Sequence, residues 1–250
     1  MRAILKREGV LRPPRSPLAF PGSNPGVNAS HTLASSILFS GVASDGGTFT
    51  NLLNGTVGTK NGTPTTVINS LGRTTRFSSS GSDNATFPSV ATNAAGQTMA
   101  VICMPDAVTS VSIRNLVSTA AGGSTGLLIA LNNTSPHWSF SYNGNFTSIP
   151  SASLPDPVAG RPYFYAVSIS SAALVVAVLR DLQTGQIYTY STTTAVATTT
   201  SDAFIYIGNR GTNSRQALSC IPAAMHSTAF NSLPALVKAA NDPWSFWYRK

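Results

Sequence analysis

The sequence has few charged residues and almost no glutamate. Lys, Arg, Asp and Glu together make up 10% of its 250 residues, against about a quarter in typical soluble domains. The only glutamate is Glu8, and the aspartates beyond it are isolated in the sequence. They are Asp45, Asp83, Asp106, Asp156, Asp181, Asp202 and Asp242. Because a glycoside hydrolase needs two carboxyl groups facing each other across the scissile bond, the sequence argues against that kind of enzyme.

Motifs for metal, cofactor or nucleophilic chemistry are also missing. His31, His137 and His226 lack the spacing of metal ligands, so we expect each to be a structural residue. No Gly-rich phosphate-binding motif is present. Residues 122–126 match the pattern G-x-S-x-G, but the following LLIALNN predicts a strand where a nucleophile elbow requires a helix. We therefore expect no catalytic residue, no metal and no cofactor.

Cysteine and long apolar runs are scarce as well. Cys103 and Cys220 cannot make a disulfide framework, and both lie in apolar runs, so we predict two buried free thiols. The longest apolar run, at residues 172–179, has the length of a strand and not of a membrane span. The basic N-terminus lacks the continuous apolar stretch of a signal peptide. We expect neither a membrane span nor a signal peptide.

Thr, Ser, Asn and Gly take the place of the missing charges, and they favour strands joined by turns. The sequence predicts ten strands, at residues 73–78, 98–104, 110–117, 126–131, 137–142, 163–170, 173–179, 186–191, 204–208 and 224–230. One short helix is predicted at 233–240, ended by Pro243. A hairpin turn is predicted at 181–185, where Gly185 supplies a positive φ. The fold class is therefore an all-β antiparallel sandwich or jelly roll.

The first 27 residues differ from the rest in composition. The net charge of the protein is +8, and residues 1–15 alone carry +4, since five basic residues stand against Glu8. The basic residues are Arg2, Lys6, Arg7, Arg12 and Arg15. This segment is also rich in proline, so we expect an extended arm at 1–27 that orders on an acidic partner. The sandwich domain would then span 28–250, and nucleic acid is disfavoured because no basic and aromatic residues alternate on it.

One local group could bind sugar. Sugar binding needs exposed aromatic rings beside hydrogen-bonding groups, and Trp138, Tyr142 and Asn143 form the only such group close together in sequence. Packing of Trp138 in the core explains the same pattern equally well.

Several segments, in order, resemble a known family. They are Phe49–Gly55, Gly72–Phe77, Thr98–Met104, Gly122–Leu131, Arg161–Val167, Leu179–Ile187, Ile205–Arg210 and the helix at 233–240 with the aromatic tail after it. The chain from Gly41 onward resembles the concanavalin A-like lectin/glucanase sandwich, in particular LamG-like domains of bacteriophage virion proteins. Active glucanases of this family carry a Glu-x-Asp-x-x-Glu strand, which is absent here, and no acidic loop resembles the calcium site of the lectins. The resemblance therefore implies the fold without either activity.

The resemblance and the arm together suggest two functions. The first is a non-enzymatic bacteriophage structural protein located in the virion, most simply a capsid (head) decoration protein and otherwise associated with the tail or fibre. Its partners would be the major capsid protein or other virion proteins, with the arm as anchor, and we expect a homo-oligomer. The alternative is a lectin-like carbohydrate-binding module that recognises surface glycans of a host.

Overall fold

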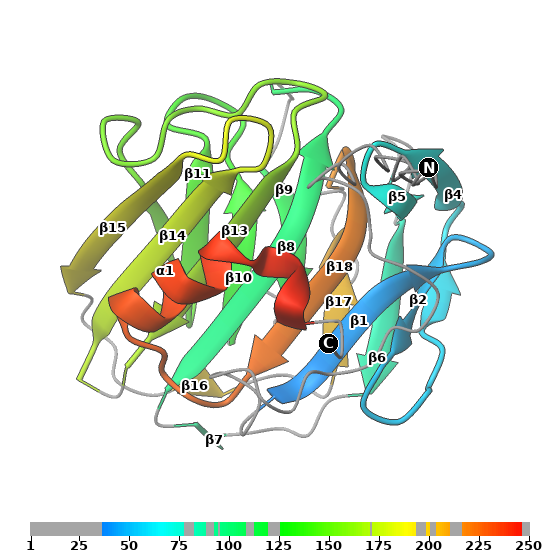
Figure 1. Ribbon diagram of the computed structural model, residues 1–250. Coiled ribbons are helices and arrows are strands. Elements are labelled where there is room, and N and C mark those ends of the chain that lie inside the picture. The colour runs from blue at the N-terminus through cyan, green and yellow to red at the C-terminus, as the bar shows by residue number, and fades with distance from the viewer. Residues whose placement is uncertain are drawn as a thin grey trace, which may run out of the picture.

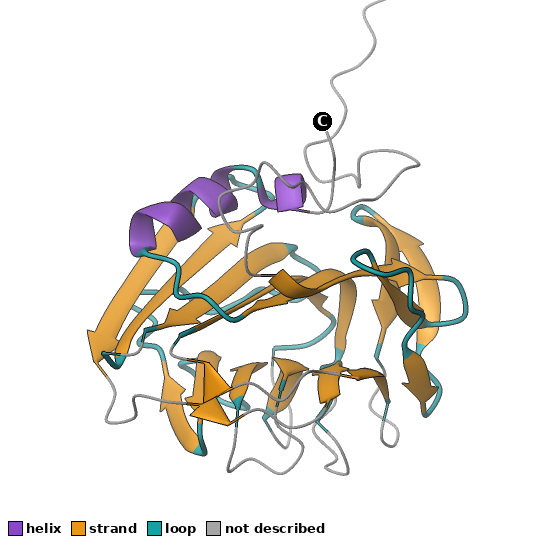
Figure 2. Ribbon diagram, turned by 90° about the horizontal axis from the view of Figure 1, so that it is seen from below, coloured by secondary structure: helices purple, strands orange, loops and turns teal. Residues whose placement is uncertain are grey.

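The computed structural model describes residues 37–77, 83–88, 93–94, 96–108, 113–119, 126–170, 172–193, 199–200, 204–210 and 217–246. The predicted arm at 1–27, with its five basic residues, lies outside the described residues. Two antiparallel sheets stack face to face, and a short helix covers the outer face of the larger one (Figure 1; Figure 2). This is the all-β sandwich that the sequence predicts.

The larger sheet has nine strands. Its spatial order is β15 (Ile187–Thr193), β14 (Leu174–Asp181), β13 (Tyr163–Ile169), β8 (Gln97–Pro105), β18 (Ser219–Ser227), β1 (Ile37–Ser44) and β2 (Thr48–Asn51). Beside this path, β5 (Gly72–Arg76) pairs with β18 and with β4 (Thr65–Asn69). The sheet therefore joins strands from both ends of the described chain.

The smaller sheet has seven strands. Its order is β12 (Asn145–Ser148), β11 (Trp138–Tyr142), β10 (Leu127–Leu131), β9 (Arg114–Ser118), β17 (Phe204–Ile207), β6 (Asn84–Pro88) and β3 (Thr59–Asn61). A separate two-stranded ladder joins β7 (Asn93–Ala94) to β16 (Thr199–Thr200).

The nine-stranded sheet buries both of its faces over its central strands. In β13, Tyr165 and Val167 point into the core between the sheets, whereas Phe164 and Ala166 belong to a second apolar cluster on the outer face. The helix α1 (Leu233–Asn241) packs on that outer face and is followed by the 3-10 turn η2 (Pro243–Phe246). Because both faces of β13 are covered, its sequence reads as a continuous apolar run instead of an alternating one.

Most predicted elements are present, with shifted ends. The helix is confirmed at Leu233–Asn241, and the turn after β14 is confirmed, with Gly185 at φ 78°. Gly126 has φ 72° and leads directly into the strand β10, so the G-x-S-x-G segment continues as a strand and not as a helix. Both cysteines are buried free thiols, and burial raises the pKa of Cys103 to about 12.

One predicted strand is misplaced and several were missed. The strand predicted at 224–230 is β18, which spans Ser219–Ser227. It begins five residues earlier because Pro222 lies at a register shift between Cys220 and Ala223, where a missing backbone N–H is tolerated. The sequence did not predict β1 to β4, β6, β7, β12 or β16. Most of these are short and rich in Thr and Asn, so they carry little apolar periodicity.

Candidate functional site

The structure places the predicted sugar-binding aromatic residues inside the protein. Trp138 is 0% exposed and Tyr142 is 1% exposed, and both belong to the core between the sheets. The prediction that these two rings offer exposed platforms is therefore wrong. Asn143 lies in the turn between β11 and β12 with φ 45°, and its backbone N–H donates to the carbonyl oxygen of Gly126 at 3.0 Å.

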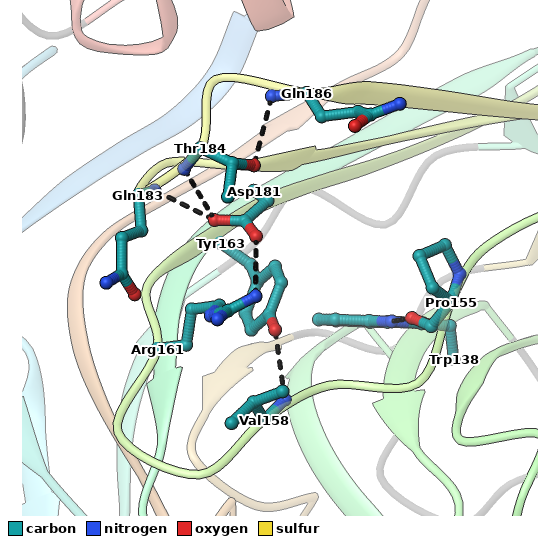
Figure 3. A network of polar contacts seen from close by, with 9 residues as sticks. All are labelled: Trp138, Pro155, Val158, Arg161, Tyr163, Asp181, Gln183, Thr184 and Gln186. Carbon is teal, nitrogen blue, oxygen red and sulfur yellow. Dashed lines mark hydrogen bonds and ion pairs between the residues drawn. The ribbon is translucent and has the colours of Figure 1, made fainter.

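Trp138 has a structural role that accounts for its burial. Its ring lies edge-on to Tyr163, with centroids 5.3 Å apart, and tilted against Tyr165 at 4.9 Å. The indole Nε1 donates to the carbonyl oxygen of Pro155 at 2.8 Å (Figure 3). This bond fixes the loop after β12 to the end of the sandwich, and it satisfies the polar atom of a ring that is otherwise surrounded by apolar groups.

A different part of the molecule forms a pocket. It lies between the β14–β15 turn and the end of α1 and has a volume of about 360 Å³. We call it the hairpin pocket. Its first wall is the end of β14 and the turn, with Arg180, Leu182, Gln183, Thr184 and Gly185. Its second wall is the end of the helix and the start of η2, with Asn241, Asp242, Pro243 and Trp244.

Asp181 holds the first wall in shape. Its Oδ1 accepts the backbone N–H groups of Gln183 at 2.8 Å and Thr184 at 3.1 Å, and its Oδ2 pairs with Arg161 at 3.1 Å (Figure 3). The Asp181 side chain is only 7% exposed. An Asp that accepts backbone N–H groups two and three residues ahead mimics a backbone turn. The turn that lines the pocket is therefore anchored by a nearly buried carboxylate.

Arg180 joins the two walls. Its Nη1 donates to the carbonyl oxygen of Ala240 at 2.7 Å and to that of Asn241 at 2.6 Å. These are carbonyl groups of the last helical turn, which have no partner within the helix and carry the negative end of its dipole. A cation placed here is bound favourably, so Arg180 fixes the end of α1 against the hairpin.

The pocket has an apolar floor and a polar rim. Leu182 and Trp244 are 7% and 6% exposed, and Pro243 is buried beside them. Gln183 and Asn241 are exposed, together with Thr184 and Asp242. An apolar surface with a few convergent polar groups is the general composition of small-ligand sites.

The aspartates of the described residues have structural partners. Asp45 pairs with Arg73 at 3.5 Å and Asp106 pairs with Arg76 at 2.9 Å, both near the surface. Asp156 accepts hydrogen bonds from Ser135 and Ser151. Within the described part of the chain, no three His, Cys, Asp or Glu side chains form a group that could hold a metal ion. No described helix is long and apolar enough to span a membrane.

The two described histidines are structural, as predicted. His137 precedes β11, and its Nδ1 lies 3.0 Å from the carbonyl oxygen of Asn132. His226 is in β18, 0% exposed, with Nε2 at 3.2 Å from Oε1 of Gln97. Burial lowers the pKa of His226 to about 4. His31 lies outside the described residues.

The buried His226 predicts a loss of stability in mild acid. Its pKa is about 4 in the folded state and about 6.5 when unfolded. Between these pH values His226 is therefore protonated in the unfolded chain and neutral in the folded protein. The folded state is fully favoured above pH 6.5, and this contribution to stability is lost as the pH falls towards 4. We expect the free energy of unfolding to fall by about 2 kcal/mol between pH 7 and pH 5. Urea unfolding at the two pH values measures this, and in His226→Gln this part of the pH dependence should disappear.

Known structures share the fold of this chain. No protein-family model and no curated protein sequence matches it. Domain 4 of AbnA, an extracellular arabinanase from Geobacillus stearothermophilus, in complex with arabinotriose, is similar over 82% of this chain and 98% of its own length, at 11% identity and a TM-score of 0.60. The ligand-binding domain of botulinum neurotoxin serotype D in complex with N-acetylneuraminic acid is similar over 82% of this chain, at 11% identity and 0.55.

A third similar structure is an enzyme. The sialidase of Trypanosoma rangeli in complex with 2,3-difluorosialic acid is similar over 84% of this chain, at 11% identity and a TM-score of 0.56. The match covers 33% of the sialidase chain and 50% of the neurotoxin chain. At these identities the likeness shows the fold alone. The chain is thus an antiparallel β-sandwich, the fold that these structures share.

Sequence reasoning missed the hairpin pocket, although it predicted both elements that form it. The turn at 181–185 and the helix ending before Pro243 were separate predictions. Arg180 and the helix end are 60 residues apart in sequence. A basic residue just before a tight turn gave no indication that it would bind the end of a distant helix.

Proposed function

We propose that this protein is a non-catalytic, lectin-like module that binds a carbohydrate in the hairpin pocket. The observation that carries the proposal is the combination of a buried apolar floor at Trp244 and Leu182 with an exposed rim of amide, hydroxyl and carboxylate groups. A sugar ring presents C–H groups on its faces and hydroxyls at its edge, and it needs both kinds of surface. A volume of about 360 Å³ is at the small end of the range for ligand pockets.

The charges of the pocket favour a neutral sugar. Arg180 is the only cation among the lining residues, and it is already engaged by two helix carbonyl groups. Asp242 contributes an opposite charge at the rim. The lining therefore offers no excess positive charge for an acidic ligand. The similar structures were solved with arabinotriose, which is neutral, and with N-acetylneuraminic acid, which is acidic, and these two sugars make a direct comparison.

Gln183→Ala should weaken sugar binding at least about tenfold, because it removes an exposed amide at the pocket rim. Titration calorimetry of the full chain with arabinotriose, and separately with N-acetylneuraminic acid, measures this. Gln186→Ala is the matched control, since Gln186 is exposed in the same hairpin but does not line the pocket (Figure 3). Equal affinity in the two variants would place the sugar elsewhere, and no binding of either sugar at millimolar concentration would count against the carbohydrate proposal.

We propose a virion as the setting in which such a module works. The observation in favour is the basic, proline-rich segment 1–27, which suits an anchor on an acidic protein surface. The protein would decorate the capsid or attach to the tail or fibre, with the sandwich carrying the glycan site outward. Deletion of residues 1–27 should abolish incorporation into particles, measured by mass spectrometry of purified virions. Incorporation of the truncated chain at wild-type occupancy would show that the arm is not the anchor.

A further inference from the structure

The strand β15 is an open edge of the nine-stranded sheet. It spans seven residues, and among the described strands it pairs only with β14. Figure 1 and Figure 2 show it as the outermost strand at the rim of the sheet, next to β14. The N–H and C=O groups on its outer side therefore have no sheet partner among the described residues, and such a row is a template for another strand.

The edge lacks the features that usually block pairing. Its sequence, IYTYSTT, contains no charged residue and no proline. Its register with β14 is regular from Ile187, opposite Arg180, to Thr193, opposite Leu174. Natural sheets protect long edges with lysine, proline or a bulge. The other edge strands of the two large sheets, β2, β3, β4 and β12, have three to five residues each, and β7 and β16 of the separate ladder have two. The strand β15 is therefore the longest edge in the described part of the chain.

The alternation of hydrogen bonds between β14 and β15 shows which residues of β15 have backbone groups free to pair with another strand. Asp181 N donates to Gln186 O at 3.0 Å, which makes these two a hydrogen-bonded pair of the hairpin. Bonded and non-bonded pairs alternate along an antiparallel ladder. Ile187, Thr189 and Ser191, together with Thr193, are therefore the residues whose backbone groups point away from β14.

We infer that β15 pairs with β15 of a second copy of this chain, antiparallel about a two-fold axis at Tyr190. In that register Thr189 of one copy faces Ser191 of the other, and Ile187 faces Thr193, so the outward backbone groups of both strands are used. An interface of this kind is self-complementary and closes as a dimer. Because the strand is uncharged, the pairing brings no like charges together, whereas an edge carrying lysine would repel its own copy.

The side chains suit the same arrangement. Tyr190 lies opposite Ala177, which belongs to the core, and Tyr188 and Tyr190 pack partly against that core. Across the two-fold axis the two Tyr190 rings meet as a cross-strand aromatic pair. Thr189 and Ser191 are exposed on the other face of the strand. The faces of the sheet therefore continue across the interface, with aromatic contacts on one side and small polar residues on the other.

The dimer would carry two hairpin pockets. Each lies at the turn before Ile187, so antiparallel pairing sets the two pockets at opposite ends of the joined strands. Two sites on one rigid sheet give avidity for a surface that displays many copies of a ligand. This consequence rests on the proposed function, but the dimer itself does not.

Sedimentation velocity of the full chain at micromolar concentrations tests the inference, with an expected mass twice the 26.0 kDa of one chain. Two double variants at exposed positions separate this register from any other contact. Thr189→Lys with Ser191→Lys places lysine opposite lysine and should weaken the dimer at least tenfold. Thr189→Lys with Ser191→Glu places lysine opposite glutamate and should keep it.

Three results would overturn the inference. They are a monomeric wild-type chain at about 100 μM, a dimer that the double-lysine variant leaves intact, and a lysine–glutamate variant that is as monomeric as the double-lysine variant. The last result would indicate that β15 receives a strand from a different protein, or in a different register. Circular dichroism of both variants checks that the sandwich is folded, and none of these results depends on sugar binding.

Discussion

Trp138→Ala is expected to lower the free energy of unfolding by about 4 kcal/mol. The ring is 0% exposed and packs against Tyr163 and Tyr165. Its removal leaves a large cavity between the sheets and takes away the hydrogen bond to the Pro155 carbonyl group. Urea unfolding monitored by circular dichroism at pH 7 measures the change.

Phe146→Ala is the control for Trp138→Ala. Phe146 lies in the neighbouring strand β12 and is 38% exposed, so its loss should cost less than about 1 kcal/mol. Similar losses for the two variants would show that Trp138 does not pack in the core between the sheets. Trp138→Ala is therefore a poor test of sugar binding. Because Trp138 is buried and does not line the pocket, a loss of binding in this variant would reflect lost stability. Gln183→Ala, at the pocket rim, tests contact with the sugar directly.

Asp181→Ala is expected to cost about 3 kcal/mol of unfolding free energy. The change removes an acceptor for two backbone N–H groups of the turn and leaves Arg161 without its partner. The Arg161 side chain is 33% exposed, so water offsets part of the loss. The turn that lines the hairpin pocket should loosen, so sugar affinity should fall together with stability. Urea unfolding and calorimetry on the same protein measure both.

Asp181→Asn separates the two roles of this carboxylate. The amide oxygen can still accept the backbone N–H groups of Gln183 and Thr184, but the ion pair with Arg161 is lost. We expect this variant to lose about 1 kcal/mol and to retain most of its sugar affinity. An Asn variant as unstable as the Ala variant would show that the ion pair, and not the turn, is the main contribution of Asp181.

The fold was predictable because its signals are local. The apolar runs that became β8, β13 and β14 are long and bounded by turn residues, and the turn at 181–185 has the Asp and Gly that its geometry needs. The strands that were missed depend on their neighbours. For example, β2 has the sequence TFTN, and Thr48 is buried although it is polar, with its hydroxyl donating to the carbonyl oxygen of Gly58 at 2.8 Å. Polar strands of this kind carry no apolar period, so sequence alone does not distinguish them from loops.

The candidate site could not be predicted in the same way. Alternation shows that Trp138 and Tyr142 share one face of a strand, but the same alternation would place them equally well on an outer face or an inner one. In the folded protein that face is buried, and the pocket is formed by residues from two distant segments.

The sequence by itself determined the fold class: a chain with few charged residues, a single glutamate and alternating strands and tight turns forms a β-sandwich. Tertiary structure alone decided which aromatic rings are covered, which strand is left at an edge, and that the β14–β15 turn meets the end of α1. Periodicity and turn chemistry depend on neighbours along the chain, whereas burial and pocket formation depend on residues that only folding brings together.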